Sequence, residues 1–213
     1  MQEDDPGSLL VSLKGDVDQL REHAHYDTVF RCIGDAVVSL TYRWKIYCEL
    51  FDSGADNLAL LNASGANVFG LLQAFALDDA ILALSRLTDP ATSGRPPKDN
   101  ASFHYLIAIA DSVQAPSTIS AARTLLTKLK GCVKDIRSHR NKAVAHPDLA
   151  HAVDPSLLPP IGYDTLEAAM QLSRELVLEL GTPGLHFTGF DTIIPFGKGP
   201  STLLAQLRLA VER

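Results

Sequence analysis

Cysteine is scarce in this chain, and the cysteines that occur form no pattern. Cys32, Cys48 and Cys132 are odd in number and far apart, so no CxxC pair exists. Such a set argues against a disulfide framework, and no histidine stands at a recognisable zinc spacing from any of the three. We therefore expect free thiols in a cytoplasmic protein, with no metal and no cofactor.

We expect no secretory leader, and the chain has no long uninterrupted hydrophobic run. It begins Met-Gln-Glu-Asp-Asp-Pro, which is acidic where a leader would be basic and then apolar. The longest apolar tract, from Val68 to Leu87, contains Asp78, Asp79 and Arg86. We expect no membrane span from a tract broken in this way.

Familiar catalytic motifs are missing as well. Gly197-Lys198-Gly199 has neither the preceding glycine nor the following serine or threonine of a phosphate-binding loop. No GxSxG, HExxH, EF-hand or GxGxxG sequence occurs, and no pair of carboxylates stands out for glycoside chemistry. None of these motifs therefore indicates a function for the chain.

What the chain does contain fits one globular domain over residues 1–213, with 46% apolar residues and no linker-like stretch. A net charge of −6 argues against a broadly basic protein that coats nucleic acid. The charge is uneven, however. Between Arg123 and His146 there are seven lysines and arginines and one acid, Asp135. This run is either a solvated helix face or the place where RNA would bind.

Apolar residues recur at helical spacing along most of the chain, which predicts an all-α, up-and-down helical bundle. Loops are expected at residues 90–100, 147–162 and 185–200, where prolines, glycines and polar residues cluster. The predicted helices cover approximately residues 8–24, 26–51, 56–61, 65–89, 100–110, 116–146, 164–180 and 201–211.

The end of the helix that starts near Pro116 carries the most informative stretch, Arg140-Asn141-Lys142-Ala143-Val144-Ala145-His146. At about 100° per residue, Arg140 falls within the apolar stripe of this helix. A guanidinium stays charged, and burying it is costly unless an anion meets it. We expect Arg140 to contact an acid elsewhere in the fold, an anionic ligand or another subunit.

Two further charged residues, Asp79 and Arg86, also occupy apolar-face positions, seven residues apart on the preceding long helix. They are separated by roughly 10 Å of helix rise, too far for direct pairing. We expect a buried network in which Asp79 or Asp89 meets Arg86 or Arg140. It is either a purely structural ion pair or part of a site lined by two arginines.

Several short phrases in this order resemble the AbiU-like, abortive-infection branch of the HEPN superfamily. They are a tryptophan-bearing helix around Trp44-Lys45-Ile46-Tyr47, the phrase Arg86-Leu87-Thr88-Asp89-Pro90, and the Arg140-Asn141 to His146 motif. The resemblance spans roughly residues 25–150. It implies a HEPN-like helical bundle that forms a homodimer, and for many such proteins a metal-independent ribonuclease activity in toxin or phage-defence systems.

The resemblance also implies roles for individual residues. Arg140 would bind the scissile phosphate, His146 would move a proton, and Asn141 would orient either group, at a composite site between two protomers. Candidates for binding the RNA substrate are the nearby basic residues Lys142, Arg137, His139 and Arg86. Asp79 and Asp89 would form the structural network. An antitoxin or another protein partner is left open.

The alternative to an enzyme is a non-catalytic helical module that binds RNA, a nucleotide or a protein. An enzyme predicts a solvent-open basic cleft that exposes Arg140 and His146, whereas a module predicts Arg140 sealed against a carboxylate. On a straight helix these two residues lie about 120° apart. They converge only if the helix is distorted at its end or if they come from different subunits.

Overall fold

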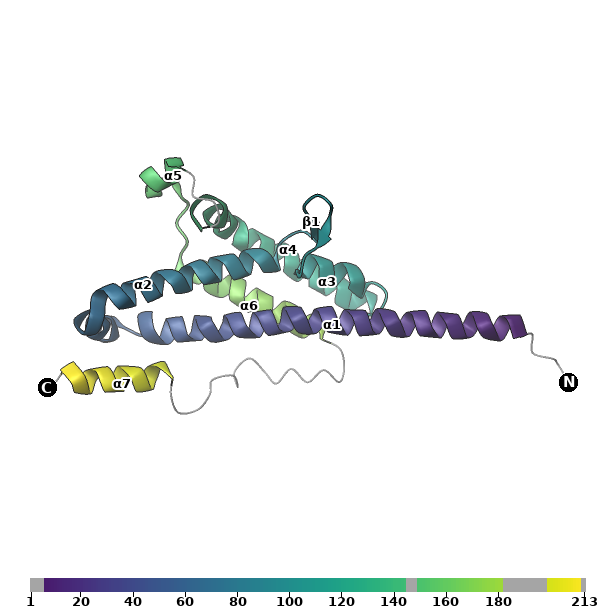
Figure 1. Ribbon diagram of the computed structural model, residues 1–213, viewed down its shortest axis with the longest axis horizontal. Helices are drawn as coiled ribbons and strands as arrows, with labels where there is room; N and C mark the ends of the chain where they lie inside the picture. Colours follow the sequence, from purple (N-terminus) through teal and green to yellow (C-terminus); the bar gives the residue numbers. More distant parts are fainter. Residues whose placement is uncertain (1–5, 145–148, 182–198, 212–213) are drawn as a thin grey trace.

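The fold is that of a computed structural model, which describes residues 6–144, 149–181 and 199–211. Two long helices dominate it (Figure 1): α1 (Pro6–Phe51) and α2 (Ala55–Leu87), which lie side by side as a hairpin. The turn between them contains Gly54 at φ 117°, a backbone conformation that favours glycine. The N-terminal part of α1 extends well beyond the other helices.

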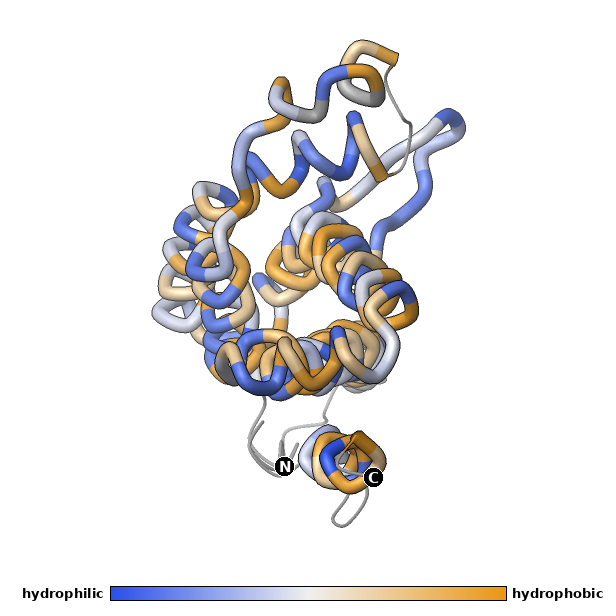
Figure 2. The backbone as a smooth tube through the Cα atoms, turned by 90° about the vertical axis from the view of Figure 1, so that its left-hand side faces the viewer, coloured by the Kyte–Doolittle hydropathy of each residue, from blue (hydrophilic) through white to orange (hydrophobic). Residues whose placement is uncertain are grey.

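The shorter elements pack on this hairpin. They are α3 (Phe103–Ala110), α4 (Pro116–His139), a π-helical turn (Arg140–Val144), α5 (Leu149–Val153), a 3-10 turn (Pro155–Leu157), α6 (Tyr163–Leu180) and α7 (Pro200–Val211). Helix α4 packs mainly against α6, and α7 packs on α1 and α2. Viewed along the bundle, the longer helices surround a common centre, whereas α7 lies outside them (Figure 2) and α5 projects on the opposite side (Figure 1). The all-α prediction is confirmed.

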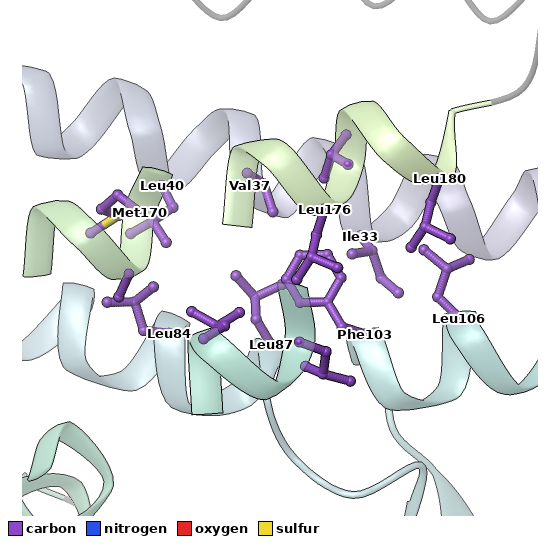
Figure 3. Close-up of a cluster of buried hydrophobic side chains, with 14 of the residues drawn as sticks. Ile33, Val37, Leu40, Leu84, Leu87, Phe103, Leu106, Met170, Leu176 and Leu180 are labelled. Carbon is purple, nitrogen blue, oxygen red and sulfur yellow. The ribbon is translucent and has the colours of Figure 1, made fainter. Parts of the chain in front are cut away.

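The core forms where one face each of α1, α2, α3, α4 and α6 meet. Figure 3 shows part of it, with Ile33, Val37 and Leu40 of α1 close to side chains of α2, α3 and α6. Trp44 lies in the same cluster, and its Nε1 donates a 2.6 Å hydrogen bond to Glu167 of α6. A smaller cluster formed by Leu50, Phe51, Leu61 and Leu204 attaches α7 to the end of the hairpin.

Several predicted boundaries were wrong. Residues 8–51 form one helix rather than two, because no glycine or proline interrupts the chain around His25. Helix α3 is capped by Ser102, whose Oγ accepts a hydrogen bond from the Tyr105 amide. Asn100, the predicted cap, instead donates to the Pro90 carbonyl at 2.7 Å. It does so at the base of a short hairpin, β1 (Thr92–Ser93) and β2 (Lys98–Asp99), within the predicted loop.

The later segments differ from the prediction in smaller ways. The connector at 147–162 contains α5 and the 3-10 turn, and the predicted capping box at the start of α6 is absent, because Gly162 is the cap residue. The final helix forms as expected. The predicted loop at 185–200 lies almost entirely outside the described residues.

Helix α2 changes direction at Gly65, where the backbone is not helical (φ 168°, ψ 67°). Among the described helices it is the one that is apolar and long enough to cross a membrane by length and composition, which by itself is weak evidence. Between Gly65 and Asp78 the uninterrupted helical run is well short of the roughly 20 residues that a span needs. Beyond Asp79, α2 contributes Ala80, Ile81 and Leu84 to the core.

Candidate functional site

Helix α4 presents a basic face directly beside its buried face. Leu129, Val133 and Ile136 are fully buried and anchor the helix in the core. Lys130, Lys134, Arg137 and Asn141 follow one another at spacings of three to four residues, so they share a neighbouring face, at whose edge Ser138 also lies. Because the core residues fix the rotation of α4, they also fix the direction in which this basic face points.

Asp89, just beyond the end of α2, holds two arginines of the α4 segment. Arg137 Nη2 donates to Asp89 Oδ1 at 2.8 Å, and Arg140 Nη1 lies 3.3 and 3.4 Å from the two carboxylate oxygens. The three side chains are between 22% and 29% exposed, so the cluster is largely shielded but reachable from solvent. At this burial the shared carboxylate offsets much of the cost of desolvating two guanidinium groups.

Within the described residues, Arg137 has more hydrogen-bond partners than Arg140. Besides Asp89, its Nη1 donates to the Ser85 carbonyl and to Thr88 Oγ1, both at 3.1 Å. Arg140 Nε donates to Asn141 Oδ1 at 3.0 Å. The end of α2 and the two residues after it therefore supply the Ser85 carbonyl, the Thr88 hydroxyl and the Asp89 carboxylate to Arg137, and Asp89 also to Arg140.

The helix changes type at Arg140. Residues Arg140–Val144 form a π turn, which alters the angular position of the following residues relative to a straight α-helix. Single π turns occur frequently at functional sites. His146, the predicted proton carrier, lies outside the described residues. Among the described residues, no group of histidines, cysteines and acids could hold a metal ion.

Two of the predicted network residues lie elsewhere. Asp79 Oδ2 pairs with Arg43 Nε of α1 at 2.7 Å, and both side chains are 46% exposed. Asp79 therefore belongs to a half-exposed pair between α1 and α2 and not to a buried network with Arg86 or Arg140. Arg86 is exposed on α2. The prediction placed both residues on the buried stripe, but α2 is buried along a narrower face than its apolar pattern suggests.

The other predicted substrate-binding residues differ in character. His139 is half-buried at the end of α4, and its Nδ1 has no hydrogen-bond partner among the described residues. Burial lowers its pKa below the ordinary value, despite the opposing influence of Asp135 and Asp78. A neutral imidazole adds no positive charge for a phosphate. Lys142 is half-buried within the π turn.

A cleft of about 680 Å³ opens beside this network. The residues that line it are Thr88, Pro90, Ala91, His104, Lys130, Val133, Lys134, Arg137, Ser138 and Asn141. No carboxylate is among them, although Asp89 lies behind Arg137. Burial, followed by the nearby charges of Lys130 and Arg137, lowers the pKa of His104. The cleft is therefore a basic site with one apolar wall.

Sequence reasoning named none of His104, Lys130 and Lys134 as an individual site residue, although the basic run from Arg123 to His146, where RNA would bind, contained both lysines. The two lysines stand four residues apart on the motif helix, in register with Arg137 and Asn141, and this spacing was a usable signal. His104 comes from α3 and lines the cleft only through tertiary packing, so its position at the site could not be predicted from the sequence.

Comparison with known proteins gives one informative result. The family model described as HEPN_AbiU2 (AbiU2) matches residues 23–182. No curated protein and no solved structure matches the chain. The matched range includes the core of α1, all of α2, the Asp89 cluster, the basic face of α4 and the π turn. Since the match covers most of the chain, this protein belongs to the AbiU2 family of HEPN proteins.

Proposed function

We propose that this protein is a metal-independent endoribonuclease of the toxin or phage-defence type. It would act in the cytoplasm as a homodimer, with the Arg140 and His146 motifs of two protomers facing each other. Membership of the HEPN superfamily supports this, because many of its members are such ribonucleases. The observation that carries the proposal is the position of Arg140, which begins a π turn beside a basic cleft and is oriented by Asp89 and Asn141.

In the proposed reaction the 2′-hydroxyl of RNA attacks the adjacent phosphorus, and the bond to the 5′-oxygen of the next nucleotide breaks. His146 would take the proton from the nucleophile or give one to the leaving oxygen. The Arg140 guanidinium would bind the phosphate oxygens on which charge accumulates. Asn141 would donate to the phosphate through its amide nitrogen while its oxygen holds Arg140. Neither a metal nor a water molecule is consumed.

The substrate must approach an arginine that already has a carboxylate beside it. Arg140 donates to Asp89 through Nη1, at 3.3 and 3.4 Å from the two carboxylate oxygens. These distances are longer than the 2.8 Å between Arg137 Nη2 and Asp89 Oδ1. The shorter bond makes Arg137 the main partner of Asp89. Arg140 can therefore exchange a weak contact with the carboxylate for a bidentate contact with phosphate.

The same contact favours a second candidate function, a non-catalytic HEPN module that binds RNA, a nucleotide or a protein such as an antitoxin. In that case the Asp89 carboxylate would permanently satisfy Arg140, whose side chain is only 22% exposed. The module would require Arg140 for stability and not for chemistry. The two functions therefore predict different consequences when Arg140 is replaced conservatively.

The test is cleavage of a mixed single-stranded RNA pool in EDTA, comparing the wild type with Arg140→Lys and His146→Ala. Lysine keeps the charge beside Asp89 but loses the guanidinium fork. We expect cleavage by the wild type and a loss of at least about 100-fold in both variants. Both must first show an unchanged melting temperature and an unchanged mass by light scattering. No cleavage by the wild type, at any tested protein concentration, would favour the module.

A further inference from the structure

The cleft beside the motif contains more positive charge than the proposed cleavage chemistry uses. Lys130 and Lys134 lie one to three turns of α4 before Arg140, and both are exposed at the cleft surface. Neither forms an ion pair with a carboxylate in the part of the chain that the structure describes. With Arg137 they place three cations around one cavity in a chain whose net charge is −6.

The walls of the cleft are as informative as its charges. Pro90 and Val133 provide apolar surface, and His104 provides a ring whose lowered pKa reflects burial and the nearby cations. A site that combines fixed and mobile cations with apolar walls, and that has no lining carboxylate, suits a phosphate attached to a sugar and a base. An inorganic anion would use the cations but not the walls.

We propose that this cleft binds the backbone phosphates of a single RNA strand on one side of the bond to be cut. Lys130 and Lys134 contact these phosphates as flexible point charges. Arg137, already fixed by Asp89, Ser85 and Thr88, lines the cleft between these lysines and the motif. The assignment of strand and scissile bond rests on the proposed ribonuclease function.

The length of the basic face supports a strand rather than a single nucleotide. From Lys130 to Asn141 the helix rises by roughly 16 Å. This distance exceeds one nucleotide and leads directly to Arg140 at the start of the π turn. The cleft therefore serves as a track that places a phosphate of the strand at the motif. Binding through the backbone carries no sequence information, so the cleft contributes affinity rather than base preference.

The experiment measures binding apart from cleavage. The probe is a fluorescent single-stranded RNA of about 12 nucleotides with 2′-O-methyl groups throughout, which removes the nucleophile and keeps the phosphates. Fluorescence anisotropy in EDTA is recorded across a salt series for the wild type and for Lys130→Gln/Lys134→Gln. The control is Lys45→Gln/Lys128→Gln, which removes the same charge at two exposed lysines outside the cleft.

We expect the cleft variant to bind about tenfold more weakly, with the slope of log affinity against log salt reduced by about 1.4, since each single-strand phosphate contact contributes roughly 0.7. The control variant should bind as the wild type does. Equal weakening in both variants would overturn the proposal, because it would reflect net charge alone. Displacement of the RNA by AMP or by poly-glutamate at equal charge concentration would also overturn it, in favour of a nucleotide or an acidic protein.

These outcomes are separable from the proposed function itself. If the wild type cleaves unmodified RNA and the cleft variant cleaves it with unchanged KM, the ribonuclease proposal stands and the cleft proposal fails. If the wild type cleaves nothing while the cleft lysines still determine binding of the methylated strand, the cleft binds RNA and the ribonuclease proposal fails.

Discussion

At the residue scale, the Asp89 carboxylate is the contact that joins α2 to the motif on α4. It accepts hydrogen bonds from Arg137 and Arg140, and Ser85 and Thr88 contribute the remaining bonds to Arg137. No helix periodicity could identify Asp89 as the partner, because the pairing depends on how two helices pack. From the sequence, either Asp79 or Asp89 could be the carboxylate that meets Arg86 or Arg140.

We predict that Asp89→Ala destabilises the fold by about 1–3 kcal/mol, because it leaves two largely shielded guanidinium groups without their carboxylate. The matched control is Asp111→Ala. Asp111 also accepts hydrogen bonds from an arginine, since Arg123 Nη2 contacts both of its carboxylate oxygens, but both side chains are about 60% exposed. Its loss should cost at most about 1 kcal/mol. Urea denaturation measures both free energies of unfolding. Equal losses would contradict the claim that Asp89 stabilises two shielded guanidinium groups.

The half-buried imidazole of His139 makes stability depend on pH. Because the pKa of His139 is lowered in the folded state, the unfolded chain binds more protons than the folded chain once the pH falls below about 6.5, the ordinary pKa of histidine. Stability is therefore full above that pH and is lost on acidification. We expect the melting temperature of His139→Gln to fall less between pH 7.5 and 5.5 than that of the wild type. Identical falls would show that His139 is not protonated on unfolding.

At the element scale, the helices were predictable from their apolar spacing, but their ends and distortions were not. The break near Gly65 was expected, since the predicted helices separate between Leu61 and Gly65, where asparagine, serine and glycine are weak helix formers. A distortion at the end of α4 was one of the two alternatives considered, but its π type was not predicted, because α and π turns use the same residue types and the difference arises from packing. The hairpin at 92–99 was missed because its two-residue strands carry no periodic pattern.

Substitutions in helix α2 test this account of the fold, because some of its apolar residues are buried and others are exposed. Leu84 is fully buried, whereas Phe75 is 62% exposed. We predict that Leu84→Ala costs about 2–5 kcal/mol through loss of burial and a cavity, whereas Phe75→Ala changes stability by no more than about 0.5 kcal/mol. Chemical denaturation at low protein concentration decides the point. A loss at Phe75 as large as at Leu84 would mean that the rotation of α2 is wrong.

At the scale of the whole molecule, the fold brings together a cleft that the sequence indicated only in part. The motif and the net positive charge of the α4 region were visible from residue types and spacing. His104, Thr88 and Pro90 line the cleft only because α3 and the end of α2 pack against α4. Local sequence patterns carry no information on this packing. Homodimer formation remains a proposal, since the structure contains a single chain.

The central claim is that this protein cuts RNA with the RNA's own 2′-hydroxyl as the nucleophile. The most direct measurement first maps one cleavage site of the wild type in EDTA. It then compares time courses on the same strand with and without a single 2′-deoxy substitution at that site. The account predicts that the substituted strand remains intact at the mapped position and is cut elsewhere as before. Equal cutting of both strands at that position, or no cutting of either, would contradict it.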